Sequence, residues 1–297
     1  MVIRKDLKPF RQSVPNAAAL AMAGDIAARL GLPFDAQAVA EQSRSLYENM
    51  FADLKQVLEI EAPPRLESGS YSLTRLFLTP DAARAPVIVL DIYFDYWIAA
   101  LSQIAAIATF TVPDKPLWLA LGARMSETFE LFVEPSRFET ARQNMAPLFA
   151  DHGELMNISF GMARAMTIFA LCHELAHWQC GHLDQAPGAE QELEADREAA
   201  SLFLRLVQRG EKAAETSVFI DPKVAGAPLL LARLFVGFEA WAGMDSARVN
   251  HPAAQERLRM LDGILRPELT PVALEIADGM AKGITDLESL LDDPAGF

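Results

Sequence analysis

Basic residues and cysteines are scarce in this chain of 297 residues. Lys and Arg together number 26 against 40 Asp and Glu, so the formal net charge at neutral pH is −14. A protein that binds nucleic acid needs a basic surface to displace counterions from phosphate, and a protein that docks on anionic lipid also needs positive charge. The acidic balance therefore predicts that neither nucleic acid nor a membrane surface is a partner.

Two cysteines, Cys172 and Cys180, are too few for a disulfide-stabilised scaffold. The N-terminal stretch MVIRKDLKPFRQSVP has basic residues but no apolar segment after them, so we do not expect a secretory signal. Residues 96–112 form a run of 17 without a formal charge, which is the lower limit for a membrane span, and we expect a buried helix there. These features predict a cytoplasmic protein with reduced thiols.

Apolar residues make up 51% of the chain, which excludes intrinsic disorder as its main state. Apolar positions recur at helical spacing, and from Phe138 onward almost every segment predicts a helix. Residues 71–79 and 87–93 instead predict strands, separated by a turn at Pro80–Pro86, and a third short strand is expected near 116–121. The prediction is an α+β fold that is mainly helical and has a small β-sheet.

The proline pair at residues 63–64 marks a change of character along the chain. An alanine-rich helix over residues 16–30 and a second helix starting near Asp35 precede it. We therefore expect an N-terminal helical annex over residues 1–64 and one main domain over residues 65–297. In the second half of the chain we expect helices over residues 154–180, 190–209, 228–243, 252–263 and 272–292.

The motif His173-Glu174-Leu175-Ala176-His177 lies near the end of the first of these helices. Histidines at i and i+4 stand one turn apart on the same face, so both imidazoles can reach one cation. Zinc takes nitrogen ligands of this kind at about 2.0–2.1 Å. Glu174 lies beside the first histidine, where it could take a proton from a metal-bound water and pass it to a leaving amine. The spacing predicts two zinc ligands and a general base, although two buried core histidines would give the same pattern.

The segment EQELEADRE, residues 190–198, opens the next helix with a run of carboxylates. Glu192 and Asp196 stand at i and i+4, so the first could be a third zinc ligand and the second could support a ligand histidine from behind. Glu194 points to the opposite face of this helix. A solvated acidic helix start, where carboxylates favour the helix dipole, would explain most of these charges without any site.

Two residues close to the motif could also complete the coordination. Cys180 stands at i+3 from His177, on the ligand face, and His182 follows the expected helix end at Gly181. A site of two histidines and a cysteine would be structural or redox-active rather than hydrolytic. The third ligand therefore stays open, with Glu192 preferred over Glu194, His182 and Cys180.

A second feature lies downstream, where His251 and Pro252 open a predicted helix that carries Arg257. Proline fits the first helical position, so His251 would project from the helix start. From there it could donate a hydrogen bond to the oxyanion of a tetrahedral intermediate. Arg257 could anchor Glu192 or Asp196. The alternative is a capping turn with a surface arginine.

The segments CHELAHWQCGHL, QELEADREAA and HPAAQERL resemble, in order and character, the Lit-like phage-exclusion peptidases. The order of HExxH, ExxAD and HPxxxxR is similar, more loosely, to that of the membrane-embedded HtpX-type zinc peptidases. The likeness covers residues 165–209 and 250–258 and is faint elsewhere. It implies a gluzincin-like metallopeptidase core with Glu174 as the base and with three zinc ligands, His173, His177 and Glu192.

This resemblance implies a cytosolic zinc endopeptidase that acts on a protein or peptide. In the Lit-like family the best-known role is abortive infection, in which a phage product switches on proteolysis of the host translation elongation factor Tu. The implied cofactor is therefore Zn²⁺, and an activating peptide or protein is an expected partner.

Other functions stay open at this point. A regulatory peptidase of the ImmA-like kind, which cuts a repressor, has the same HExxH motif followed by an acidic helix. A non-catalytic, zinc-stabilised binding protein would close its coordination sphere with Cys180 or His182. A membrane-embedded peptidase that uses residues 96–112 as a span is the least expected.

Overall fold

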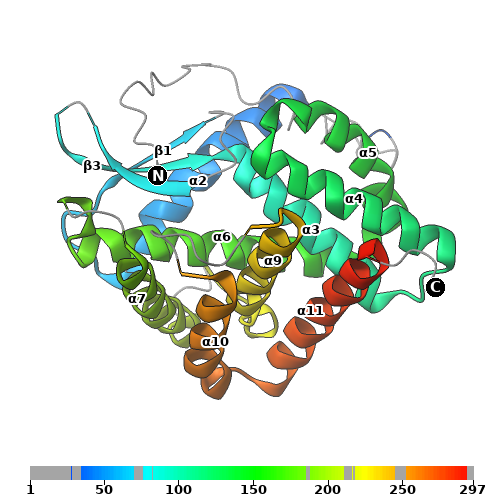
Figure 1. The fold of residues 1–297 in the computed structure, drawn as a ribbon. Coiled ribbons are helices and arrows are strands. Elements are labelled where there is room, and N and C mark those ends of the chain that lie inside the picture. The colour runs from blue at the N-terminus through cyan, green and yellow to red at the C-terminus, as the bar shows by residue number, and fades with distance from the viewer. Residues whose placement is uncertain are drawn as a thin grey trace.

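The computed structural model describes residues 28, 35–69, 76–81, 83–184, 188–210, 216, 218–244 and 252–292. These residues form a mostly helical molecule with one small sheet at its edge (Figure 1). The α+β prediction is therefore confirmed. The helices are α2 (Ala36–Leu58), α3 (Ile92–Phe110), α4 (Lys115–Val133), α5 (Phe138–Asp151), α6 (Met156–Gln179), α7 (Ala189–Gln208), α9 (Ala227–Trp241), α10 (Ala254–Leu265) and α11 (Pro271–Asp292).

The sheet is mixed and has the strand order β1-β3-β2, with β1 (Arg65–Gly69), β2 (Leu76–Pro80) and β3 (Pro86–Asp91). The central strand β3 pairs parallel with β1 and antiparallel with β2. Both strands predicted around the turn at residues 80–86 are present, and residues 71–75 lie outside the described part. Strand β1 was not predicted, because its sequence RLESG lacks the apolar run that indicates a strand.

The expected third strand near residues 116–121 is wrong, because these residues lie in α4. The side chain of Asp114 caps this helix by accepting a hydrogen bond from the Leu117 N–H at 2.9 Å. Pro116 fits the first turn, where a missing N–H costs nothing. A short apolar window is compatible with both structures, and here the cap decides for the helix.

The long uncharged run at residues 96–112 forms most of α3, which packs against α4, α6 and α11. Most of its residues are buried, so the prediction of a core helix is confirmed. By length and composition alone, residues 153–179 and 222–241 could cross a membrane, but more than half of each apolar window is buried in the protein. Buried core helices have the same composition, so this finding is weak evidence for a span.

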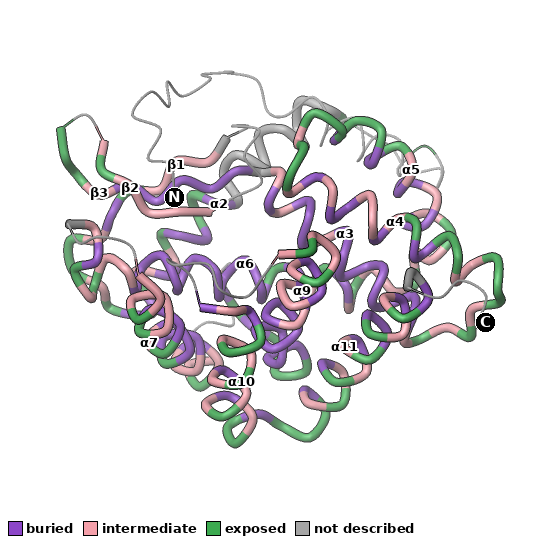
Figure 2. Tube along the Cα trace, in the orientation of Figure 1, coloured by how far each residue is buried: buried purple, intermediate pink, exposed green. Residues whose placement is uncertain are grey.

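Helix α6 runs through the middle of the molecule and is buried over much of its length (Figure 2). It packs on α3, α7, α9 and strand β2. This position explains why its sequence is apolar on nearly every face rather than along one stripe. The C-terminal turns of α6, which carry the histidine motif, lie where the core meets α7 and the sheet.

The second-half helices agree with the predicted ranges to within a few residues. The helix expected over residues 16–30 lies outside the described part of the chain, apart from residue 28. Helix α2 packs on β1 and α7, and its buried side chains join the same hydrophobic core as α6. The division between residues 1–64 and 65–297 stays a prediction.

Candidate metal centre

Helices α6 and α7 pack together, joined by the segment at residues 180–188 (Figure 1). Helix α6 contributes His173 and His177 from its last turns, and α7 contributes Glu192 from its first turn. The ligand atoms of these three side chains lie within 4.8 Å of one another. The structure thus brings together the three residues that the sequence predicts as zinc ligands.

The two imidazoles face each other through their Nε2 atoms, 3.0 Å apart. Glu192 lies beside them, with Oε2 at 3.5 Å from His173 Nε2 and Oε1 at 3.7 Å from His177 Nε2. Two ring nitrogens at this distance cannot both present lone pairs, so a proton or a cation must lie between them. Two nitrogens and a carboxylate oxygen are a donor set that zinc accepts. We call the space between these atoms the ligand gap.

Behind His173 lies a carboxylate that is sealed from water. Asp196 Oδ1 is 2.9 Å from His173 Nδ1, a close contact that lacks the alignment of a regular hydrogen bond. Arg257 on α10 donates two hydrogen bonds to this carboxylate, from Nε at 2.6 Å and from Nη2 at 2.7 Å. The Asp196 side chain is 0% exposed. We call Asp196 and Arg257 the buried support.

The buried support is held as an ion pair. Desolvation alone would raise the pKa of Asp196, but Arg257 and then His173 outweigh it and lower that pKa to about 2. Burial likewise opposes the charge of Arg257, yet Asp196 raises the pKa of the guanidinium above its usual value. Arg257 also lies 4.0 Å from Glu192, so its main partner is Asp196.

The two histidines differ in charge when no cation is bound. Burial lowers the pKa of both, but at His173 the carboxylates of Asp196 and Glu192 outweigh it and raise the pKa to about 10. At His177 burial and then the charge of His173 lower the pKa to about 3. The two shifts favour a proton on His173 over one on His177, and a metal ion in the ligand gap would displace it.

Glu174 is buried and contacts the sheet. The Leu78 N–H of strand β2 donates to Glu174 Oε2 at 2.6 Å. Burial is the main cause that raises the pKa of Glu174 to about 7, and Glu192 raises it further while His173 lowers it. A carboxylate with this pKa can both accept and return a proton near neutral pH. Sequence reasoning missed Leu78, because it acts through its backbone and any residue could supply that N–H.

Behind His177 lies a second imidazole. His182 Nδ1 is 2.9 Å from His177 Nδ1, and His182 Nε2 is 3.1 Å from Glu194 Oε2. His182 and Glu194, which we call the outer support, thus lie on the side of His177 away from the ligand gap. Gly181 has φ +71°, a left-handed conformation that lets the chain turn back at the end of α6.

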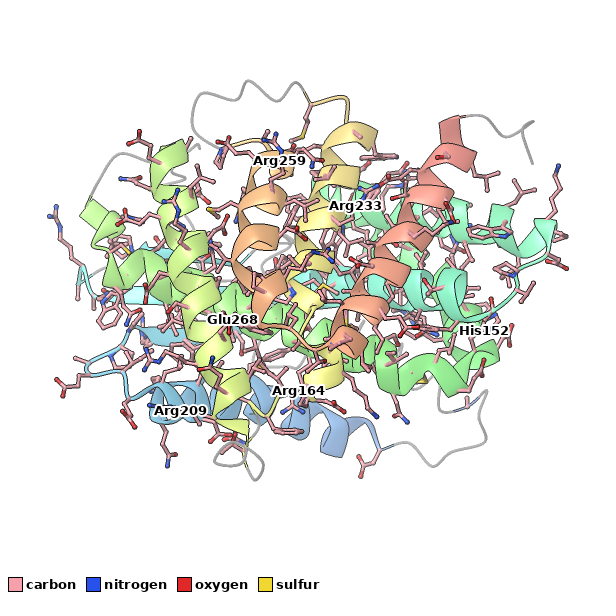
Figure 3. All side chains as sticks on the ribbon, turned by 90° about the horizontal axis from the view of Figure 1, so that it is seen from below. His152, Arg164, Arg209, Arg233, Arg259 and Glu268 are labelled. Carbon is pink, nitrogen blue, oxygen red and sulfur yellow. The ribbon has the colours of Figure 1, made fainter. Side chains whose placement is uncertain are left out.

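The remaining candidates are placed elsewhere. His251 lies outside the described residues, so its role in stabilising the oxyanion stays a prediction. Cys180 lies next to the outer support, within 4.8 Å of His182 and Glu194. Cys172 is fully buried in the core. His152, which is not a candidate for the site, lies on the opposite side of the molecule from α7 (Figure 3).

Comparison with known proteins gives one match. The family model described as Peptidase U49 matches residues 135–268, a segment that contains all of α6, α7 and α10. No curated protein and no solved structure matches the chain. The part of the chain that carries the candidate site is therefore similar to the U49 peptidases, and this similarity supports a peptidase family.

Proposed function

We propose that this chain is a zinc-dependent endopeptidase of the cytoplasm, with Glu174 as the general base and His173, His177 and Glu192 as zinc ligands. The observation that carries the proposal is the pair of Nε2 atoms facing each other at 3.0 Å beside a carboxylate. A second carboxylate, that of Glu174, follows His173 in the chain and is held by a backbone N–H of strand β2. The U49 match over the same segment supports peptide-bond hydrolysis as the reaction.

Each residue of the site has a separate task in this reaction. Zinc, when bound, would polarise the scissile carbonyl and lower the pKa of a water molecule to about 7. Glu174 would take the proton from that water and later give it to the leaving amine. The Leu78 N–H on Oε2 fixes the orientation of this carboxylate. The buried support keeps His173 turned so that Nε2 faces the ligand gap.

The sheet edge beside the base favours a polypeptide as the substrate. Within the described residues, β2 has β3 on one side and no strand on the other. An extended peptide can add to such an edge through main-chain hydrogen bonds. The contact of Leu78 with Glu174 places this edge next to the base. We therefore infer that the cleaved bond lies in an extended segment of a longer chain.

The biological role that we propose rests on the Lit-like resemblance. In this role the enzyme acts in phage exclusion by cleaving a host protein such as a translation elongation factor, after an activating peptide or protein has bound. A closed structural zinc site is disfavoured, because His182 Nδ1 faces His177 Nδ1 and not the ligand gap. In a phage-exclusion role the free enzyme should have little activity, so constitutive cleavage of many proteins would contradict it.

Metal content and cleavage, measured on the same samples, test the enzymatic proposal. Wild type and Glu174→Gln should each hold about one zinc per chain by mass spectrometry. In a library of peptides derived from a whole proteome, wild type should show weak cleavage at a few sites and Glu174→Gln none, because this variant lacks the base. Glu190→Gln, an exposed carboxylate of α7, is the matched control and should cleave as wild type does. Absence of metal from folded wild type, or cleavage by Glu174→Gln, would contradict the proposal.

A further inference from the structure

We propose that His182 and Glu194 are positioning residues that hold His177 in the tautomer that can bind a metal ion. The inference rests on the proposed function, because it takes His177 Nε2 as a metal ligand. It adds two residues that touch neither the ligand gap nor the base.

The atoms behind His177 allow one consistent set of protons. If His177 binds a cation through Nε2, its proton lies on Nδ1. Nδ1 is 2.9 Å from His182 Nδ1, which must then offer a lone pair. The proton of His182 therefore lies on Nε2, which is 3.1 Å from the carboxylate oxygen Oε2 of Glu194. Every donor in this series meets an acceptor.

The opposite tautomer of His182 leaves two unfavourable contacts. A proton on His182 Nδ1 would leave the lone pair of Nε2 facing the Glu194 carboxylate at 3.1 Å. It would also require His177 to accept at Nδ1 and to carry its own proton on Nε2, which points into the ligand gap. Glu194 thus sets the tautomer of His182, and His182 sets that of His177. A metal site gains affinity when its histidine is oriented in this way.

The local fold makes this arrangement specific. His182 follows the end of α6, yet its side chain is only 5% exposed. A buried imidazole needs partners for its polar atoms, and His177 and Glu194 supply them. Helix α7 therefore contributes two carboxylates to the surroundings of His177. Glu192 lies beside the ligand gap, and Glu194 lies behind His182.

A second metal ion is the competing explanation, because Cys180, His182 and Glu194 have ligand atoms within 4.8 Å of one another. Such an ion would need the thiolate of Cys180. The ion would also take His182 Nε2 away from its hydrogen bond with Glu194. The geometry therefore favours hydrogen bonds here over a metal ion.

Cobalt(II) affinity, measured on the full chain by competition with a chelator, tests the proposal without a substrate. His182→Ala should bind cobalt about 10- to 100-fold more weakly than wild type, the usual effect of losing a group that orients a metal ligand. His182→Gln should recover part of this loss, because its amide oxygen can accept the proton of His177 Nδ1. Glu194→Gln should weaken binding to a smaller extent, and Cys180→Ser is the matched control that should bind as wild type.

The outcomes separate this inference from the proposed function. Folded wild type that binds no cobalt would overturn the proposed function and the inference together. Wild-type binding that His182→Ala and Glu194→Gln leave unchanged would overturn the inference alone. A second cobalt per chain, with a thiolate-to-cobalt absorption band that Cys180→Ser removes, would replace it with a metal site. Glu194 is 60% exposed, so Glu194→Gln keeps the test available if His182→Ala does not fold.

Discussion

His173 and His177 lie one helical turn apart, yet the protein supports them in different ways. Behind His173 the buried support joins α7 and α10 through a carboxylate that is 0% exposed and a guanidinium that binds it twice. Behind His177 the outer support consists of an imidazole and a carboxylate that is 60% exposed. One histidine is backed by an ion pair whose carboxylate has no exposed surface and whose arginine side chain is 26% exposed, and the other by hydrogen bonds that end at an exposed carboxylate.

This difference shows that two neighbouring ligands can depend on different parts of the fold. A buried ion pair contributes little net stability when formed, but breaking it from one side is costly because a charge is left in the interior. An exposed carboxylate is screened by water and salt, so its loss has a small effect on folding. We therefore expect the orientation of the His173 ring to depend on the protein core, and that of the His177 ring to depend on the turn that follows α6.

The largest expected effect concerns the buried support. Replacing Arg257 with Ala leaves the Asp196 carboxylate without its guanidinium at a position that has no exposed surface. Breaking a buried pair in this way should lower the free energy of unfolding by about 3–5 kcal/mol. Urea-induced unfolding of the metal-free protein, followed by circular dichroism, measures the change.

Two further variants are compared with Arg257→Ala in this experiment. Arg259→Ala is the matched control, because Arg259 lies on the same helix and is exposed (Figure 3), and it should stay within about 0.5 kcal/mol of wild type. Glu194→Ala removes the carboxylate of the outer support and should cost at most about 1 kcal/mol. Equal destabilisation by Arg257→Ala and Glu194→Ala would remove the distinction between the two supports.

The second effect concerns metal affinity and the identity of the third ligand. Glu192 lies beside both Nε2 atoms, whereas Glu194 lies behind His182. Glu192→Gln should weaken cobalt binding by more than about 100-fold, beyond the usual loss for a group that only orients a ligand. Glu194→Gln, which differs in position but not in chemistry, should have a much smaller effect. The reverse order in a chelator competition would make Glu194 the ligand.

Helical periodicity explains how much of this site could be predicted from the sequence. Within one helix, residues at i and i+4 share a face whatever the rest of the fold does, so His173 with His177, and Glu192 with Asp196, could be paired before the structure was known. The buried helices α3 and α6 were predictable for a similar reason, since long apolar segments need a core. The pairing of Arg257 with Asp196 was one of two options that the sequence left open.

The contacts that could not be predicted depend on turns and backbone groups. The approach of His182 to His177 follows from the left-handed conformation at Gly181, which a helical pattern cannot express. The Leu78 N–H donates to Glu174 from a strand that is far away in the sequence. Every residue except proline has such a backbone donor, so the sequence does not single out Leu78. The expected strand near residues 116–121 is wrong because the local cap at Asp114 outweighed a short apolar pattern.

A third effect extends the comparison to a buried carboxylate that has no guanidinium partner in the described structure. Asp95 on α3 accepts hydrogen bonds from the hydroxyls of Tyr47 and Thr167. Burial raises the pKa of Asp95, and the two hydrogen bonds only oppose this rise. The pKa of Asp196, which has a cation beside it, moves in the other direction.

The direction of the Asp95 shift predicts a pH dependence of stability. An acid whose pKa is higher in the folded state favours folding most at a pH below its unfolded pKa of about 3.9, and this contribution is lost as the pH rises through the folded pKa. Asp95→Asn cannot ionise. Its free energy of unfolding, relative to wild type, should therefore increase as the pH is raised from acidic to neutral. Urea unfolding across this range measures the difference, and a difference that falls with pH would contradict the assignment.

The smallest effect separates the two supports by their response to salt. The Debye length falls to about 3 Å at 1 M salt, which screens charges in contact with water but affects a carboxylate without exposed surface much less. The ratio of cobalt affinities between wild type and Glu194→Gln should shrink about twofold when salt is raised from about 0.05 M to about 1 M. The corresponding ratio for Asp196→Asn should stay constant, because Asp196 has no exposed surface. If the ratio for Asp196→Asn responded to salt as strongly as the ratio for Glu194→Gln, both carboxylates would be screened by solvent. The distinction between the buried support and the outer support would then be wrong.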